Sequence, residues 1–284
     1  MEDTTILDEH AIISPPAINA KDISIRKTKF IIDSRDRNIN KYPSPSKYTI
    51  TPEEPLTDVT NVELILTDFK FNNYNVNKYN NILHTSGGDY TISQGVYDGS
   101  TLASKLTSST PFTVSYNSVN EKLTITSSLN TTLVFTNPVK KQYNLDTMVD
   151  VYMTNSIGHL LGFDIKDYDL VAGVPFEVPN PISLETENYI VMYMQQAKVY
   201  QSKNNNIHNC FAIINKLENS SNGLVMFNNT VSKSFNPPIA NLNNLVFKFC
   251  DYHGNLYDFQ NKEHRFELLF SSLKQTRCYN QIFL

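Results

Sequence analysis

The residue types that most often carry out chemistry in proteins are spread thinly along this chain. Six histidines are present, and none stands at the HxH, HxxxH or HExxH spacing of a metal site. His208 and Cys210 are two positions apart, so on a strand they would point to the same face. Zinc normally takes three or four protein ligands, and two do not make a site. We therefore predict no metal site and no cofactor.

Nucleophilic and acid–base catalysis have little support in the sequence. There is no GxSxG elbow and no glycine-rich phosphate loop, and the chain has only 9 glycines. A hydrolytic pair of carboxylates can be distant along a chain, and the candidates are Glu53-Glu54 and Glu185 with Glu187. Both pairs fall in turn-like segments, where solvated loop carboxylates are the simpler interpretation. We predict that the protein is not an enzyme and has no catalytic residues.

The densest charge cluster is Asp33-Ser34-Arg35-Asp36-Arg37, which directly follows a short apolar run. One interpretation is an ion-pair network at a subunit interface, because arginine forks bind carboxylates in a bidentate geometry. The other is a solvated turn after an edge strand. Both interpretations stay open, and Asp33, Arg35, Asp36 and Arg37 are the candidate interface residues.

Composition argues against a nucleic-acid partner and against a membrane span. The 284-residue chain has a formal net charge of −4, whereas a phosphate-binding surface needs clustered Lys and Arg. No apolar run reaches the roughly 18 residues of a transmembrane helix. Residues 1–20 are acidic and lack a continuous apolar core, so no secretory signal is expected. Three cysteines without CxxC spacing favour free thiols in a reducing compartment.

The residue types also predict a β-rich fold. Only 18% of residues are charged, and the chain contains 16 Tyr, 16 Phe and no Trp. Aromatic residues pack well on pleated sheets, and the abundant Asn suits the turns between strands. Alternating or apolar runs predict strands at 29–32, 48–51, 59–71, 89–92, 112–116, 122–127, 132–136, 188–199, 245–250 and 266–270. Residues 188–199 fit a helix as well, but their Tyr, Ile and Val favour a strand. Residues 210–216 and 223–227 are predicted to pair with each other.

One helix is predicted, at about residues 100–108. Three apolar side chains of this segment lie on one helical face, and Asp98 or Ser100 can cap its N-terminus. A single helical turn is expected within 156–163, ending at Gly162, because glycine suits the position after a helix end.

Many short strands with a single helix predict a mostly β fold, specifically a jelly-roll β-sandwich with an extended N-terminal arm. We assign residues 1–26 to the arm and residues 27–284 to the jelly-roll domain. The long connections rich in Asn and Tyr leave room for an insertion, or a second small β domain, at about residues 165–245.

Three stretches, taken in order, resemble a recurrent pattern. The first, "IIDSRDRNINKYPSPSKYTITPEEPLTDVTNVELILTDF", joins a charged turn, a Y-P-x-P-x-x-Y segment and a V-x-x-V-E-L strand. The second, "YTISQGVYDGSTLASKL", is a strand, turn and helix, followed by an F-x-V-x-Y hairpin and a later L-L-G-F. The third, "LVFKFCDYHGNLYDFQNKEHRFELLF", is a strand, a D-x-x-G turn and a closing strand. Together they resemble jelly-roll penton and minor capsid proteins of the nucleocytoplasmic large DNA viruses, or giant viruses, and of their mobile-element relatives.

The resemblance implies a structural protein of an icosahedral virus capsid. The role it implies first is the penton protein, a homopentamer at the fivefold vertices, and the next is a minor capsid or cement protein. Its partners would then be further copies of itself and other capsid proteins, including a major capsid protein. Its location would be the virion, assembled in the host cytoplasm. The interface interpretation of Asp33 to Arg37 gains from this resemblance.

A function of another class is also open, namely a fibre or lectin-like attachment module of the same architecture. Exposed Tyr and Asn side chains can stack on and hydrogen-bond to sugars, although the chain lacks the Trp that such sites favour.

Overall fold

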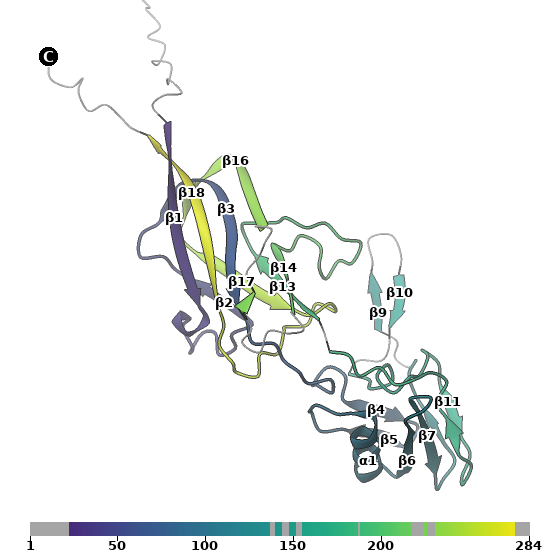
Figure 1. Ribbon diagram of the computed structural model, residues 1–284. Helices are drawn as coiled ribbons and strands as arrows, with labels where there is room; N and C mark the ends of the chain where they lie inside the picture. Colours follow the sequence, from purple (N-terminus) through teal and green to yellow (C-terminus); the bar gives the residue numbers. More distant parts are fainter. Residues whose placement is uncertain are drawn as a thin grey trace, which may run out of the picture.

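The computed structural model describes residues 23–136, 140–143, 148–151, 155–186, 188–216, 224–225 and 231–275 (Figure 1). Residues 1–22 of the predicted N-terminal arm lie outside the described residues. Residues 23–26, which the sequence also assigned to the arm, are the beginning of the first strand.

Two antiparallel sheets form the larger part of the molecule. Their strands are β1 (Ile23–Asp33), β2 (Lys47–Ile50), β3 (Leu56–Asp68), β13 (Tyr189–Met194), β14 (Ala212–Asn215), β15 (Leu224–Val225), β16 (Val231–Leu242), β17 (Leu245–Cys250) and β18 (Arg265–Gln275). In the first sheet the order is β1-β18-β3, and both β15 and β16 pair with β3. In the second sheet the order is β14-β13-β17-β2.

This strand order is that of a jelly roll. When β1, β2, β3, β13, β14, β16, β17 and β18 are numbered in chain order, the two sheets read 1-8-3-6 and 2-7-4-5. Consecutive strands therefore alternate between sheets at most steps, and the first strand pairs with the last. The prediction of a mostly β, jelly-roll sandwich is confirmed by this topology.

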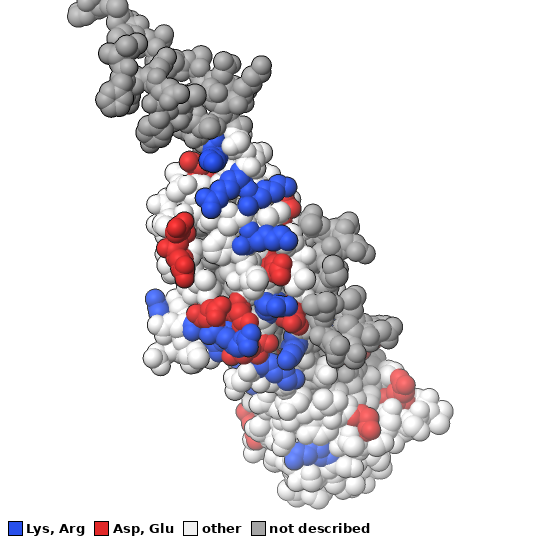
Figure 2. Space-filling model, turned by 60° about the vertical axis from the view of Figure 1, so that its left-hand side comes forward, with Lys and Arg blue, Asp and Glu red and all other residues white. Residues whose placement is uncertain are grey.

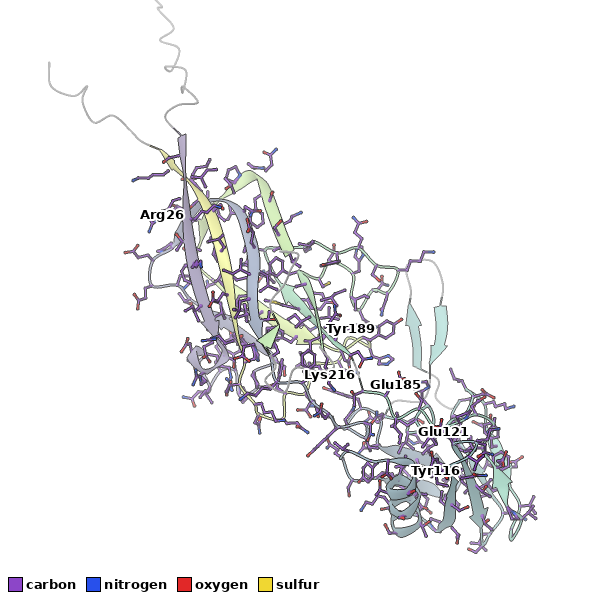
Figure 3. All side chains as sticks on the ribbon, viewed as in Figure 1. Arg26, Tyr116, Glu121, Glu185, Tyr189 and Lys216 are labelled. Atoms are coloured by element: carbon purple, nitrogen blue, oxygen red, sulfur yellow. The ribbon has the colours of Figure 1, made fainter. Side chains whose placement is uncertain are left out.

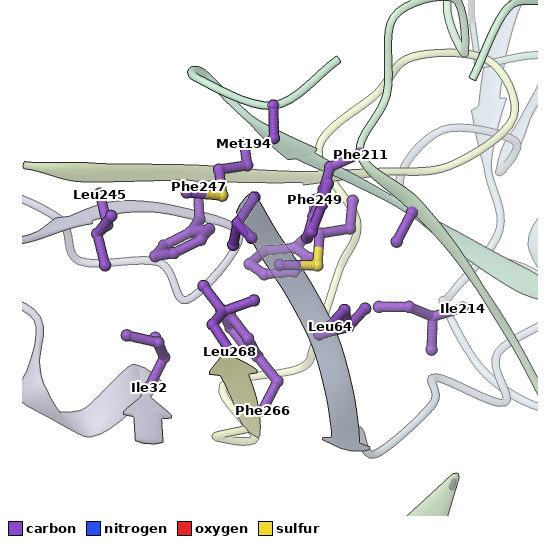
Figure 4. Packing of buried hydrophobic residues seen from close by; sticks show 14 of the residues in the cluster. Ile32, Leu64, Met194, Phe211, Ile214, Leu245, Phe247, Phe249, Phe266 and Leu268 are labelled. Carbon is purple, nitrogen blue, oxygen red and sulfur yellow. The ribbon is translucent and has the colours of Figure 1, made fainter. Parts of the chain in front are cut away.

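Aromatic and aliphatic side chains fill the space between the two sheets (Figure 4). Alternate residues of each strand point inwards, as strand geometry requires. Phe266, Leu268 and Phe270 of β18 come from one sheet, and Phe247 and Phe249 of β17 come from the other; all five side chains are buried. Among the described residues the interior of the sandwich is therefore a packed core of side chains from both sheets.

A second unit is inserted between β3 and β13. Its elements are β4 (Ile82–Thr85), β5 (Gly88–Thr91), α1 (Gly99–Ser109), β6 (Phe112–Asn117), β7 (Lys122–Ser127), β8 (Thr131–Leu133), β9 (Lys140–Tyr143), β10 (Met148–Val151), β11 (Tyr168–Leu170) and β12 (Phe176–Glu177). They form small sheets of order β11-β8-β4-β5, β12-β7-β6 and β10-β9. A separate hydrophobic cluster, drawn from residues 76–178, holds this unit together.

The insertion lies beyond one end of the sandwich, away from the end at which β1 begins (Figure 1). Polar contacts join the two parts: the Tyr79 hydroxyl donates to the Leu256 carbonyl at 2.9 Å, and Lys216 Nζ donates to Asn73 Oδ1 at 2.9 Å. Figure 3 labels Lys216 near this junction.

The position of the insertion differs from the 165–245 that the sequence suggested. Residues 189–194, 212–215 and 231–242 are strands of the two main sheets, and the second hydrophobic cluster lies before them in the chain. The patterns of the two units are alike, because both consist of short antiparallel strands that bury one face. Only the pairing partners reveal which strands belong to which core.

The pairing predicted between 210–216 and 223–227 is wrong for the described residues. The first segment contains β14, which pairs with β13, whereas β15 pairs with β3 in the opposite sheet. Strand β16 was not predicted, because Pro237 and Pro238 signal a break in a strand. These prolines lie where the register between β16 and β3 shifts, so pairing continues on both sides of them.

The predicted helix is present as α1. Asp98 caps it: Asp98 Oδ1 accepts a hydrogen bond from the Thr101 backbone N–H at 2.7 Å, and Thr101 Oγ1 accepts one from the Asp98 N–H at 2.9 Å. Leu102 and Leu106 are buried on its inner face. This reciprocal capping box satisfies two N–H groups that the helix itself leaves unpaired.

Gly162 ends a helical turn in the insertion, as predicted. The Phe163 N–H donates to the Gly158 carbonyl at 3.0 Å, and Gly162 itself has a φ of +86°. A Cβ at this position would lie 2.2 Å from the Asn180 carbonyl oxygen. Gly173 also has a positive φ, +73°, but a Cβ there would meet nothing within 4 Å.

Gly162→Ala is therefore expected to destabilise the insertion much more than Gly173→Ala. The positive φ alone costs alanine about 1–2 kcal/mol at either position, and only Gly162→Ala adds a clash with backbone. Hydrogen exchange read by mass spectrometry should show faster exchange in β6 and β7 of Gly162→Ala, with the exchange of β17 and β18 unchanged. Equal effects of the two substitutions would contradict this account.

Candidate interaction surfaces

The charged turn at Asp33 to Arg37 follows the last residue of β1. Residues Ser34–Asp36 form a single 3-10 turn. Asp33 caps this turn, because its Oδ1 accepts from the Arg35 backbone N–H at 2.9 Å. Its carboxylate also accepts two bonds from the Arg35 guanidinium, from Nε at 2.9 Å and from Nη2 at 2.5 Å. Asp33 and Arg35 thus form a local bidentate pair.

Arg37 points the opposite way, into the protein. Its side chain is only 4% exposed, whereas that of Arg35 is 72% exposed. The guanidinium donates from Nη1 to the Ser34 carbonyl at 2.5 Å and to Glu263 Oε2 at 2.6 Å. It also donates from Nε to the Tyr42 carbonyl at 2.9 Å. The Arg37 guanidinium therefore makes these hydrogen bonds within its own chain and does not face a partner.

Ser34 completes the link between this turn and the segment before β18. Ser34 Oγ donates to Glu263 Oε2 at 2.5 Å, across 229 residues of sequence. Ser34 Oγ also accepts a hydrogen bond from the His264 backbone N–H at 2.8 Å, and the Ser34 backbone N–H donates to the His264 carbonyl at 2.9 Å. We call Ser34, Arg37, Glu263 and His264 the closing network, because it holds the ends of the first and last strands together.

The hydrogen bonds of the charged turn and of the closing network favour the ionised forms of Asp33 and Glu263. The hydrogen bonds from Arg35 hold the pKa of Asp33 below its usual value. Partial burial alone would raise the pKa of Glu263, but the hydrogen bonds from Arg37 and Ser34 outweigh it and lower the pKa. Both groups therefore stay charged at neutral pH.

His264 is the most deeply buried titratable part of the network. Its ring stacks on Phe69 with centroids 4.6 Å apart, and Phe249 meets it edge-on at 4.7 Å. Nε2 lies 3.0 Å from the Tyr48 hydroxyl. Burial, with a smaller effect of the nearby Arg37, lowers the pKa of His264 to about 3. The ring is therefore neutral under ordinary conditions and serves packing.

The four candidate interface residues consequently divide into an inner and an outer part. Arg37 is buried in the closing network, and Asp33 is engaged by Arg35. Arg35 and Asp36 are exposed on the outer side of the turn. The sequence could not distinguish Arg35 from Arg37, because their partners are set by a turn of three residues and by Glu263 far along the chain.

A second surface, which the sequence reasoning missed, is the outer edge of β1. Among the described residues β1 pairs with β18 alone, so its other side is a free strand edge. Arg26, Lys27 and Lys29 are exposed along it. Ile25 is 63% exposed and Ile31 is 61% exposed on the same strand. Figure 2 shows Lys and Arg side chains gathered along this side of the sandwich, and Figure 3 labels Arg26 near the start of β1.

A groove lies next to this edge. Its lining comprises Arg26, Thr28 and Phe30 of β1, residues 53–58, and Ser272, Leu273 and Lys274 of β18. Cations of β1 and β18 are thus brought together with the carboxylates of Glu53 and Glu54. With both signs of charge in its lining, the groove is not selective for a simple anion or a simple cation.

A third exposed apolar surface lies in the insertion. Leu129 is 72% exposed, and Val171 and Val174 are also exposed. The loops that carry them are joined, because the Gly173 N–H donates to the Ser127 carbonyl at 2.8 Å. The three side chains therefore belong to neighbouring loops of the insertion.

His208 and Cys210, which the sequence places two positions apart, do not come together in a common site. His208 Nδ1 lies 3.1 Å from the Ser202 carbonyl oxygen, whereas Cys210 packs with Val191 and Cys250. Within the described ranges no group of three or more His, Cys, Asp or Glu side chains is arranged to hold a metal. In the same ranges no helix is long and apolar enough to cross a membrane.

Two of the three cysteines are described, and both are free and buried. Burial raises the pKa of the Cys210 thiol to about 11 and also raises that of Cys250. Both are therefore thiols at neutral pH, with little nucleophilic thiolate. Cys278 and Glu187 lie outside the described residues, and Glu185 is exposed.

The chain is similar to known proteins in one family model and in solved structures. The model of DUF5901, described as a family of unknown function, matches residues 21–223. No curated protein matches the sequence. A crystal structure of the mavirus penton protein has a TM-score of 0.35 and 13% identity, covering 88% of this chain and 99% of that chain. A chain in the cryo-EM structure of the Sputnik virophage has a TM-score of 0.36 and 11% identity, covering 87% and 98%.

Removing the inward arginine should cost far more stability than removing its outward neighbour. Arg37→Ala removes the charged donor of Glu263, which keeps its bond from Ser34 Oγ, and also removes the guanidinium bonds to the Ser34 and Tyr42 carbonyls. A loss of about 2–3 kcal/mol is expected. Arg35→Ala removes an exposed pair, so the loss should be much smaller. Urea unfolding followed by tyrosine fluorescence measures both. If Arg35→Ala is as damaging as Arg37→Ala, the closing network does not hold the strand ends as described.

The buried His264 should make stability fall as the pH is lowered from about 6.5 towards 3. In this window the unfolded chain binds a proton at His264 and the folded chain does not, so the free energy of unfolding decreases by up to about 1.4 kcal/mol per pH unit. His264→Gln should be less stable at pH 7 but should lose less stability between pH 6.5 and 4.5. The matched control is His159→Gln, the same substitution at an exposed histidine outside the closing network. The same slope in His264→Gln would argue against this assignment.

Proposed function

We propose that this chain, which belongs to the DUF5901 family of unknown function, is a structural protein of an icosahedral virus capsid. Within that role we propose the penton, a homopentamer at the fivefold vertices that also contacts other capsid proteins, including a major capsid protein. The protein would reside in the virion, assembled in the host cytoplasm, and would have no enzymatic activity.

The observation that carries the proposal is a complete jelly roll with a solid interior. Jelly rolls occur in viral capsid proteins, in lectins and in cupins. A cupin works through a metal or ligand inside the barrel, but here the inner faces of both sheets are occupied by side chains such as Phe247, Phe249 and Phe266. A sandwich that is filled in this way acts through its outer surfaces, as a capsid building block does.

The three resembling stretches support the same role, and two of them contain the residues that close the sandwich. The first stretch covers the end of β1, the charged turn, β2 and β3. The third covers β17, the segment with Glu263 and the start of β18. The second covers β5 and α1, which lie in the insertion. The first and third stretches therefore contain the closing network, and the second contains part of the inserted unit.

The shape of the molecule suits a ring. Identical subunits close into a ring when two different side surfaces of each copy fit together head to tail. The β1 edge and its neighbouring groove are on one side of the sandwich, and the insertion projects from one end (Figure 1). In a vertex ring of jelly rolls, the insertion would point away from the shell and the start of β1 towards it.

Two alternatives use the same fold. A minor capsid or cement protein would bind beneath or between major capsid capsomers without forming a pentamer. A fibre or lectin-like attachment protein would bind sugars through exposed tyrosines, of which Tyr74, Tyr200 and Tyr252 are each more than a third exposed. These three lie on separate loops, which gives no specific support to a sugar site.

The purified full-length chain is expected to form pentamers. Mass photometry should then detect a species of five times the 32.4 kDa chain mass, because obligate rings bury on the order of 2,000 Å² or more at each contact. A stable monomer at micromolar concentration would contradict the penton role and would leave the cement role. Saturable binding on a glycan array by a monomer would favour the attachment role instead.

A further inference from the structure

We propose that the free edge of β1 binds residues 1–14 of a neighbouring copy as an added β-strand. This inference rests on the proposed homopentamer and names a contact that joins its subunits. The acceptor is the outer edge of β1, from Ser24 to Ile31. The donor is the segment that precedes β1 in the next copy.

In the part of the chain that the structure describes, strand β1 offers an unpaired edge. Its register with β18 runs without interruption from Ile23 paired with Gln275 to Asp33 paired with Arg265. One side of β1 is thus fully paired, and in the described residues no strand pairs with its other side. A free edge of this length presents alternate N–H and C=O groups, which bind an extended segment by strand addition.

The charge of the β1 edge disfavours a second β1 edge as its partner and favours an acidic segment. Arg26, Lys27 and Lys29 are exposed on β1, and Lys274 of β18 is exposed beside them. Arg26 and Lys274 share the adjacent groove with Glu53 and Glu54, whereas Lys27 and Lys29 lie outside its lining and give the edge its basic character. Two β1 edges would therefore repel each other, since like charges directly opposite across strands are destabilising. The occupant of this edge should be an acidic segment.

The N-terminal segment of this chain has that character. Residues 1–14 contain Glu2, Asp3, Asp8 and Glu9 and no Lys or Arg. The C-terminal residues 276–284 contain Arg277 and no acidic side chain, so they do not complement the edge. Charge complementarity thus points to residues 1–14.

Apolar side chains of the two segments match as well. Residues 1–14 carry Ile6, Leu7, Ile12 and Ile13. On β1, Ile25 and Ile31 are exposed at either end of the basic stretch. Cross-strand pairs of β-branched and aliphatic side chains, together with opposite charges, are what stabilise neighbouring strands.

The length and the residues of the connection favour a neighbouring copy over a fold-back onto the same β1. The eight residues 15–22 that connect the donor segment to β1 can span at most roughly 29 Å when extended, so the acceptor edge must lie within about that distance of the donor's own β1. A fold-back would need a reversal within residues 15–22. That stretch begins with Pro15-Pro16 and contains no glycine, whereas tight hairpin turns favour Asn-Gly, Asp-Gly or Gly-Gly.

A photo-crosslinking experiment on the full-length chain tests the inference. Ile25 is replaced by benzoylphenylalanine, and this variant is mixed with an equal amount of ¹⁵N-labelled chain before illumination. Mass spectrometry should then find the probe joined to residues 1–14 of the ¹⁵N-labelled copy. The matched control is the same probe at Leu129, which is similarly exposed but lies in the insertion. It should give no crosslink to residues 1–14.

In a second experiment, the charges of the acceptor edge and of the donor segment are reversed, and the yield of the inter-copy crosslink is measured. Lys27→Glu with Lys29→Glu should lower the yield of the inter-copy crosslink roughly tenfold, because two attractive pairs become repulsive. Asp8→Lys with Glu9→Lys in the partner copy should restore it. The control is Lys203→Glu with Lys262→Glu, a reversal of two exposed lysines elsewhere, which should leave the yield unchanged.

Each outcome bears on the proposal. Crosslinks between copies that respond to the charge exchange support it. Crosslinks only within one copy, or none to residues 1–14, overturn it. If mass photometry shows pentamers while these crosslinks are missing, the strand addition is wrong and the penton role stands. If the chain is a monomer throughout, the penton role itself has failed.

Discussion

The pairing of the first strand with the last is the constraint on which the rest of this structure depends. Residues at opposite ends of the sequence must meet, as Ser34 and Glu263 do across 229 residues. Closing such a long loop costs conformational entropy. The paired length of β1 and β18 and the closing network offset that cost. Once the pair has formed, β1 becomes a sheet edge, the aromatic core is enclosed, and the β3–β13 connection can carry a unit with a core of its own.

In this arrangement some charged and titratable side chains stabilise the interior, and others remain on the surface, where they can contact a partner. Arg37 and His264 lie in the interior with their side chains committed to Glu263, to backbone carbonyls and to aromatic rings. Arg35, Asp36 and the basic residues of β1 lie outside. A jelly roll of this kind can change its surface residues without disturbing its core, so interaction properties and stability are set by different residues.

Much of the fold could be predicted from local patterns, and the parts that could not depend on distant partners. The β6–β7 hairpin and α1 follow from alternation and from the Asp98 cap, which act within a few residues. Strand β16 was missed because Pro237 and Pro238 are tolerated only where its register with β3 shifts. The boundaries of the insertion, and the inward direction of Arg37, are decided by pairing partners that lie far away in the sequence.

The central claim, that the chain is a vertex protein of a capsid, is tested most directly by a vertex-focused cryo-EM map of the virus particle that encodes it. The account predicts five copies around each fivefold axis, with the jelly roll in the shell and the insertion projecting outwards. Vertices built from a different chain, or particles that lack this chain, would contradict it.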